Sequence, residues 1–256
     1  MCSRGEQIDP NIANQQVKNN VVPGRIRAGL ISIERIYGWR PPYDDRMTNP
    51  ARTERSALCD LFLEVGPDAP TLCGEWTTRD LAAHLVVRET RPDAAAGILI
   101  PAAARHGERV RLHVAEQPWE KLVDRVRSGP PFWSPTRLPA IDQLANTVEF
   151  FVHHEDVRRG DGDITPRTLT PELSKALWGA LGRMGRLLVR HAPGGVTFFD
   201  SAHGQVEAKK GTPGVTVTGP VGELVLFAYG RQSRTACVVD GPPDLVSATQ
   251  TASFGI

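Results

Sequence analysis

The chain has 256 residues, of which 40% are hydrophobic and 23% are charged, and its formal net charge is +1. This composition allows one large or two modest globular domains, and the near-zero charge gives no general attraction to nucleic acid or to an anionic membrane. We see no run of about 18 apolar residues and no leader with a small-residue cleavage site, so we expect a cytoplasmic protein with no membrane partner.

Residues 1–46 differ in composition from the rest of the chain. They are rich in Asn, Gln, Gly, Pro and Arg and show no sustained helical or strand period. We expect this segment to be a disordered extension. Its seven basic and five acidic residues leave a weak interaction arm as the alternative.

Two helices are predicted next. The first covers 50–65, because Asn49 is a good N-cap and apolar residues recur at helical spacing until Gly66-Pro67. The second opens with Thr77-x-x-Asp80, a box-like cap in which the acidic group also suits the helix dipole. Its segment 81–87 is apolar almost all round, which predicts a central helix with one histidine, His84.

Residues 94–115 predict a helix in two pieces around Pro101, and 119–126 predict a short helix. His106 and His113 share one face, but charged neighbours indicate solvated surface rather than metal ligands. The proline-dense loop 129–139 is expected to be stiff; it either walls a pocket or caps the core.

The segment 144–159, LANTVEFFVHHEDVRR, carries the main chemical signal. Glu149 and His153 are four residues apart, so on a helix they are separated by a rise of about 6 Å and a turn of about 40° and can face one point. They border an apolar stripe that consists of Ile141, Leu144, Val148, Phe151 and Val152. A divalent cation would satisfy both polar groups at the margin of a core, and His84 is the natural third ligand.

Each part of this pattern also has an ordinary explanation. A lone Glu-x-x-x-His is common on solvated helices, and a single histidine on an apolar helix is usually a satisfied core residue. Two separate helices that both offer inward ligands favour a metal site, and their donors suit zinc or a similar first-row metal. Arg88, one turn after His84, either contacts an anionic substrate or pairs with a neighbouring acid.

Two further residues near these ligands have open assignments. Asp156 lies three residues after His153, where it either orients a ligand from the outer shell or pairs with Arg158 or Arg159. The four cysteines form no C-x-x-C pair, so no disulfide framework is predicted. We interpret Cys73 as a small buried thiol, with a position near the site as the alternative.

After a turn at 160–163, a helix is predicted from Thr170 to Arg190. The composition then changes to short strand-like segments, with a helix at 222–228 before the last of them. The strands are expected at 196–199, 205–208, 215–218 and 236–239. We place a small α/β domain at 195–256.

The motif CGEWTTRDLAAHL at 73–85, followed by Glu149-x-x-x-His153-x-x-Asp156, resembles the DinB-like metalloprotein superfamily. Within it, the match is to the metal-binding domain of mycothiol-dependent maleylpyruvate isomerase and its uncharacterised relatives, over 47–240. The resemblance implies a mainly α fold, with an up-and-down four-helix bundle at 47–194. It also implies a metal triad of His84, Glu149 and His153.

The resemblance implies less about the reaction. It suggests a metal-dependent transferase or isomerase that uses a low-molecular-weight thiol such as mycothiol on a small-molecule substrate, as a monomer or homodimer. A non-catalytic metal-binding or stress-response protein and a metal-dependent hydrolase remain alternatives, so whether the chain is an enzyme stays open. The segment 217–231 resembles the end of the isomerase C-terminal domain, which makes Arg231 a candidate catalytic residue. A guanidinium at a helix C-terminus can clamp a substrate carboxylate, although the helix dipole alone also explains its position.

Overall fold

The structure is a computed structural model, and it describes residues 49–91, 93, 104–130 and 139–255, with the backbone alone for 139–145. The predictions for 1–46, for the helical piece before Pro101 and for most of the loop 129–139 lie outside the described residues. The described residues belong to one compact unit. None of the helices described here has the length and apolar character needed to cross a bilayer.

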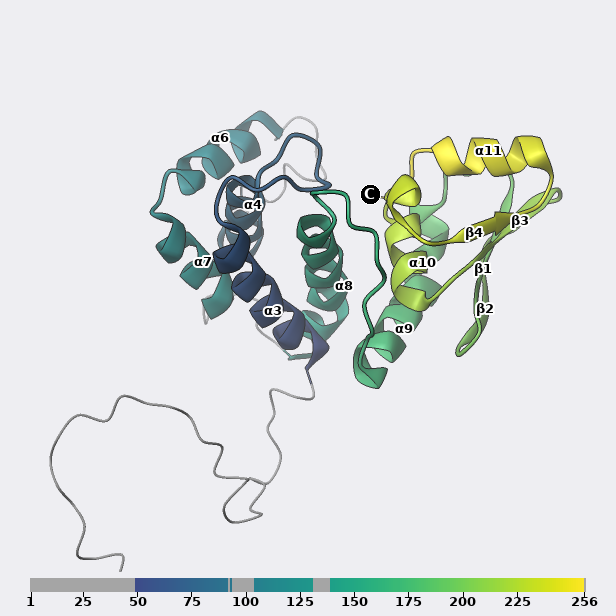
Figure 1. Cartoon of the computed structure of the whole chain (residues 1–256), viewed down its shortest axis with the longest axis horizontal. Coiled ribbons are helices and arrows are strands. Elements are labelled where there is room, and N and C mark those ends of the chain that lie inside the picture. The colour runs from purple at the N-terminus through teal and green to yellow at the C-terminus, as the bar shows by residue number, and fades with distance from the viewer. Residues whose placement is uncertain (1–48, 92, 94–103, 131–138, 256) are drawn as a thin grey trace, which may run out of the picture. The chain divides into compact units, whose positions relative to one another are not determined.

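The first half of the described chain is helical (Figure 1). Asn49 caps its first helix by accepting hydrogen bonds from the backbone N–H groups of Ala51 and Arg52. The predicted capping box of Thr77 and Asp80 starts the second. The helices are α3 (Pro50–Val65), α4 (Thr78–Thr90), α6 (Ala104–Ala115), α7 (Trp119–Ser128) and α8 (Pro139–Arg158).

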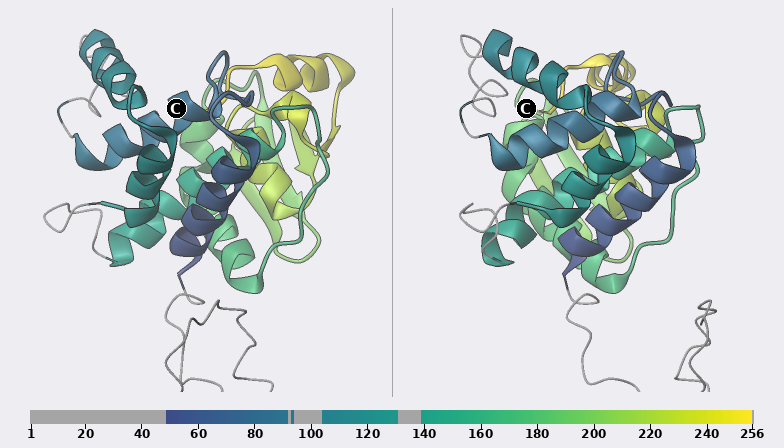
Figure 2. Two further views of the ribbon diagram at one scale, coloured as in Figure 1. Left: turned by 60° about the vertical axis from the view of Figure 1, so that its left-hand side comes forward. Right: turned by 90° about the vertical axis from the view of Figure 1, so that its left-hand side faces the viewer.

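The second half holds one mixed sheet with strand order β2-β1-β3-β4. β1 pairs with β2 antiparallel and with β3 parallel, and β3 pairs with β4 antiparallel. The helices α9 and α10 pack against this sheet (Figures 1 and 2). In chain order the elements are α9 (Pro171–Leu188), β1 (Gly195–Asp200), β2 (Gly204–Lys209), β3 (Gly214–Thr218), α10 (Val221–Ala228), the 3-10 turn η4 (Gln232–Arg234), β4 (Val238–Asp240) and α11 (Pro243–Thr251).

The predicted elements correspond closely to these. The last strand begins at Val238 rather than at residue 236, and the sequence analysis missed α11. Within α11 only Thr249 is fully buried. The helix therefore has no buried apolar stripe by which its sequence could have been recognised.

Helix α8 lies between two cores. Val148, Phe151 and Val152 pack with α9, α10 and the sheet, whereas Phe150 and Val157 pack with α3, α4 and α7. Because both sides of α8 are buried, the polar residues between these apolar groups are held inside the molecule. The fold is therefore mainly α with a small sheet, while the four-helix bundle and the domain boundaries stay predictions.

Candidate metal centre

Helices α4 and α8 bring His84, Glu149 and His153 together. Glu149 Oε1 lies 3.6 Å from His84 Nε2 and 3.3 Å from His153 Nε2. One potential ligand atom from each residue lies within 4.8 Å of the other two. Two histidines and a carboxylate thus converge on one point, although His84 and Glu149 are more than sixty residues apart in the chain.

The spacing suits a small divalent ion. Zinc ligands at about 2.1 Å in a tetrahedron lie about 3.4 Å from one another, which matches the two separations from Glu149. The side chains of His84, Glu149 and His153 remain 15%, 23% and 12% exposed. Three protein ligands with some solvent access are typical of catalytic zinc sites, in which water or substrate takes the fourth position.

The electrostatics of Glu149 and His84 also favour a cation. Burial by itself would raise the pKa of Glu149, but His153, His84 and Arg88 hold it well below its usual value. Burial lowers the pKa of His84, and the nearby His153 adds to the effect. Near neutral pH, Glu149 is therefore ionised. His84 is neutral and can offer a ring nitrogen lone pair to a metal ion.

Burial would also lower the pKa of His153, but hydrogen bonds with Asp156, Cys73 and Glu149 raise it well above its usual value. A metal at His153 Nε2 must therefore displace a proton. Besides the proton on His153, Arg88 also competes with a metal ion, because its Nε lies 3.2 Å from Glu149 Oε1. Its Nη1 donates to Asn146 Oδ1 at 2.6 Å. Of its two predicted alternatives, the structure shows the ion pair with an acid.

Asp156 lies at the ring nitrogen of His153 that is not next to Glu149. Its Oδ2 lies 2.9 Å from His153 Nδ1, and its carboxylate receives a two-pronged hydrogen bond from Arg231, with Nε at 2.9 Å from Oδ1 and Nη2 at 2.7 Å from Oδ2. Burial opposes ionisation of Asp156, yet His153 and Arg231 lower its pKa to about 2.

The sequence had offered Arg158 or Arg159 as partners of Asp156. In the structure Arg159 pairs with Glu155 and Glu223, and Arg158 donates to the Thr165 carbonyl. Arg158, two positions after Asp156, points to another side of α8. Arg159 lies three positions after Asp156, but its guanidinium is held by Glu155 and Glu223 instead.

Arg231 reaches the centre through the chain reversal that follows α10. Tyr229 ends the helix, Gly230 adopts a positive φ of 87°, and the Arg231 N–H donates to the Leu226 carbonyl. The remaining Arg231 nitrogen, Nη1, donates to the Tyr229 carbonyl at 2.5 Å. The guanidinium therefore faces Asp156, and the predicted clamp on a substrate carboxylate remains a prediction.

Cys73 lies at the centre, contrary to its interpretation as an ordinary buried thiol. Its Sγ is 3.1 Å from Asp156 Oδ2 and 3.7 Å from His153 Nδ1. The loop that carries it is held against α8: Leu72 N–H donates to the Asp156 carbonyl at 3.0 Å. At Gly160 an added Cβ would come within 2.0 Å of the Pro70 carbonyl oxygen.

Cys73, His153 and Asp156 form a second possible ligand group. That group shares His153 with the first but uses the carboxylate on which Arg231 already lies. A cation there would meet the guanidinium charge at close range, so the group of His84, Glu149 and His153 is favoured.

Three other residues complete the account of the predicted site. The Trp76 ring lies 5.2 Å from the His84 ring and forms an aromatic wall that the sequence analysis did not assign. His106 Nε2 lies 2.9 Å from Asp93 on the surface, and the His113 side chain is 83% exposed. Both histidines are solvated, as their charged neighbours indicated.

Two solved structures of one enzyme are similar to this chain in fold. The fold is similar to the crystal structure of the mycothiol-dependent maleylpyruvate isomerase, with a TM-score of 0.51 and 14% sequence identity, over 78% of this chain and 95% of that one. A histidine-to-alanine mutant of that enzyme matches with a TM-score of 0.53 at the same identity and coverage. No family model and no curated protein matches the chain. At this identity the likeness concerns the fold.

Proposed function

We propose that the chain binds one divalent ion, zinc in the first instance, through His84, Glu149 and His153. The observation that carries the proposal is the convergence of their three ligand atoms within 4.8 Å. The proposal includes the predicted DinB-like four-helix arrangement at 47–194 and the small C-terminal domain at 195–256.

We further propose that this centre serves a thiol S-transferase or isomerase of the mycothiol type, which acts on a small molecule. The likeness to an isomerase that depends on mycothiol supports the proposal at the level of the fold. When bound, such a metal lowers the pKa of a coordinated thiol or water and so supplies a nucleophile near neutral pH.

The chain's own residues would prepare the centre for this chemistry. When His153 Nδ1–H donates to Asp156, its Nε2 lone pair is presented towards Glu149 and the proposed ion. Arg231 keeps Asp156 ionised and in place, which makes Arg231 a positioning residue in this proposal. Trp76 shields the same region on the side of His84.

Metal analysis tests the first step. Purified full-length protein is expected to retain about one zinc ion per chain after dialysis, and His84→Ala is expected to lose it. His113→Ala is the matched control, because that side chain is exposed and pairs with Glu116. Zinc retained by His84→Ala, or equal loss in both variants, contradicts the assignment.

The second step is tested by incubating zinc-loaded protein with mycothiol and a small electrophile and following thiol consumption. Consumption that His84→Ala abolishes supports the transferase or isomerase. Tight zinc binding without turnover supports the non-catalytic alternative, and turnover of a hydrolysable substrate without thiol supports the hydrolase.

A further inference from the structure

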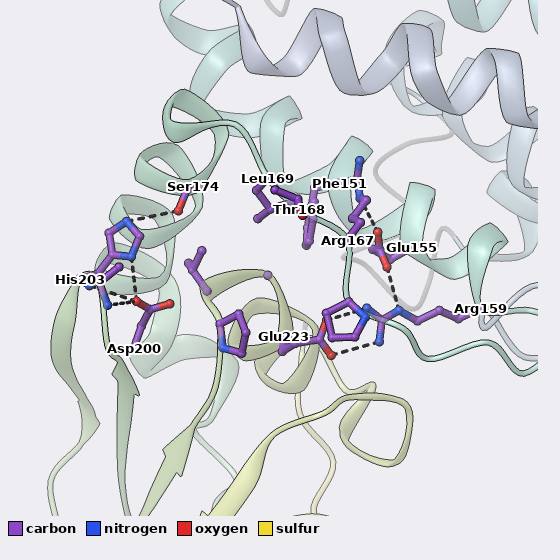
Figure 3. A pocket seen from close by; sticks show the side chains of 15 residues that line it. Phe151, Glu155, Arg159, Arg167, Thr168, Leu169, Ser174, Asp200, His203 and Glu223 are labelled. Atoms are coloured by element: carbon purple, nitrogen blue, oxygen red, sulfur yellow. Dashed lines mark hydrogen bonds and ion pairs between the residues drawn. The ribbon is translucent and has the colours of Figure 1, made fainter.

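A chain of three hydrogen-bonding side chains lies on a cavity apart from the metal centre. Ser174 Oγ is 3.3 Å from His203 Nε2, and His203 Nδ1 is 3.1 Å from Asp200 Oδ1. Figure 3 shows these three residues along one side of the cavity. Hydroxyl, imidazole and carboxylate in this order are the groups of an activated serine nucleophile.

The local fold holds each member in place. Asp200 ends β1, and its Oδ1 accepts the backbone N–H groups of Ala202 (2.7 Å) and His203 (3.0 Å), which fixes the turn before β2. Ser174 lies in the first turn of α9. One turn later, Trp178 stacks on the His203 ring at 5.3 Å and 29°. The imidazole is thus fixed by its turn, by Asp200 and by an aromatic plane.

The charges suit proton transfer from the serine. Burial opposes the ionisation of Asp200, but hydrogen bonds from Ala202 and His203 bring its pKa below the usual value. An ionised Asp200 accepts the Nδ1–H of His203, and in that tautomer Nε2 can accept the hydroxyl proton of Ser174. The His203 side chain is 20% exposed and Asp200 only 7%, so the base meets the cavity while its orienting acid stays buried.

The cavity has a volume of about 230 Å³. Phe151, Leu169 and Val221 contribute apolar surface to it. The charged groups opposite Ser174 form two ion pairs, one between Arg159 and Glu223 and one between Arg167 and Glu155 (Figure 3). A space this small, with neutralised charges, suits a short uncharged ligand.

The first turn of α10 belongs to the same lining. Val221, Gly222 and Glu223 begin that helix, and the first N–H groups of an α-helix have no acceptor within it. At Gly222 an added Cβ would come within 3.0 Å of the Phe151 ring, so the helix backbone approaches the cavity closely. Free N–H groups at the start of a helix are donors of the kind that stabilise a developing oxyanion.

We propose that Ser174, His203 and Asp200 form a second active site, which hydrolyses short, uncharged carboxylic esters. Ser174 Oγ attacks the carbonyl carbon while its proton passes to His203 Nε2. The carbon–oxygen bond to the alcohol breaks, and the alcohol leaves with that proton. Water then attacks the acyl-serine, gives a proton to His203 and releases the acid, and the proton returns to Ser174.

The site is independent of the metal centre. Among the described residues that line the cavity, none is a member of the triad of His84, Glu149 and His153. The two proposals can therefore fail separately, and His84→Ala, which removes the proposed metal, is expected to leave Ser174 reactive.

The test is covalent capture of the serine. The full-length protein is treated with diethyl 4-nitrophenyl phosphate; the Ser174 oxygen displaces 4-nitrophenolate, and the modified peptide is identified by mass spectrometry. We expect a burst of about one 4-nitrophenolate per chain, with diethyl phosphate on Ser174. Ser174→Ala is expected to abolish the burst, and His203→Gln to slow it on the order of 10³-fold.

Ser201→Ala is the matched control, because Ser201 is an exposed serine in the same turn, and it is expected to react as the wild type does. Asp200→Asn keeps an acceptor for the backbone of the turn but removes the charge, so it is expected to slow the burst without unfolding the turn. The proposal is overturned if Ser174 in the folded wild type is modified no faster than Ser201, a result that requires no variant to fold. It is also overturned if folded His203→Gln reacts at the wild-type rate.

Discussion

His84 and Glu149 face each other from two different helices, with 3.6 Å between His84 Nε2 and Glu149 Oε1. The same Glu149 oxygen lies 3.3 Å from His153 Nε2 and 3.2 Å from Arg88 Nε. Three nitrogen-containing side chains thus converge on one carboxylate oxygen. This arrangement makes Glu149 the residue on which the metal proposal depends most.

Glu149→Gln is expected to lower zinc affinity by more than the roughly 10–100-fold that is typical of losing an outer-shell partner. Glutamine keeps the shape of the side chain, but it removes the charge that offsets the metal. Competition with a chromogenic chelator measures the affinity. Glu75→Gln, an exposed residue near the start of α4, is the control and should bind as the wild type does. A Glu149→Gln variant with undiminished affinity would show that the carboxylate is not a ligand.

Asp156→Asn is expected to weaken zinc binding on the order of 10-fold, because the acceptor of His153 Nδ1 loses its charge. Arg231→Met is expected to act in the same direction, since it removes the bidentate partner that holds Asp156. The double variant should lose little more than Asp156→Asn alone, because Arg231 acts through Asp156. Isothermal titration of the three variants measures this, and fully additive losses would show that Arg231 acts on the centre independently.

Gly160→Ala is expected to destabilise the fold by at least about 1–3 kcal/mol, the usual cost of forcing atoms into a packed region. The new Cβ would meet the Pro70 carbonyl oxygen at 2.0 Å and would push the loop of Cys73 away from α8. Gly182→Ala is the control: a Cβ there meets nothing within 4 Å on the exposed face of α9, so a gain of about 0.5–1 kcal/mol is expected. Urea unfolding measures both, and equal stability of the two variants would contradict the proposed close approach.

Glu54 is expected to make the stability of the protein acid-sensitive. Its carboxylate is buried and faces His154 and Arg167; burial would raise its pKa, but these two partners lower it below its usual value. A lowered folded-state pKa means that the stabilisation is complete above about pH 4.5 and is lost as the pH falls through the folded-state value.

The variant Glu54→Gln tests this assignment. It should cost about 1–3 kcal/mol near neutral pH, and its deficit relative to the wild type should shrink as the pH falls below about 4.5 and through the lowered folded-state pKa. Unfolding titrations across this range measure the difference, with the exposed residue Glu64→Gln of the same helix as the control. A deficit that is constant with pH would assign the effect to packing instead.

Local signals determined most of the elements in advance. Asn49, the box of Thr77 and Asp80, and the apolar spacing of α9 predicted where helices begin and which faces are buried, because capping and periodicity depend on neighbours within a few residues. The pairing of Glu149 with His153 was equally local, since a separation of four residues on a helix places both side chains on one side. The helix α11 escaped prediction because its burial comes from tertiary contacts rather than from a pattern in its own sequence.

Only the tertiary structure decided which distant groups meet. Cys73 lies beside Asp156 because Gly160 and Leu72 hold its loop against α8, and no sequence spacing encodes that contact. The chain of Ser174, His203 and Asp200 depends on α9 packing against the sheet, so the sequence showed no sign of it. The sequence alone thus predicted most of the helices and strands and the residues that we propose to bind a metal. Packing between elements decided their partners, since a side chain's hydrogen bonds depend on distances that only the folded chain sets.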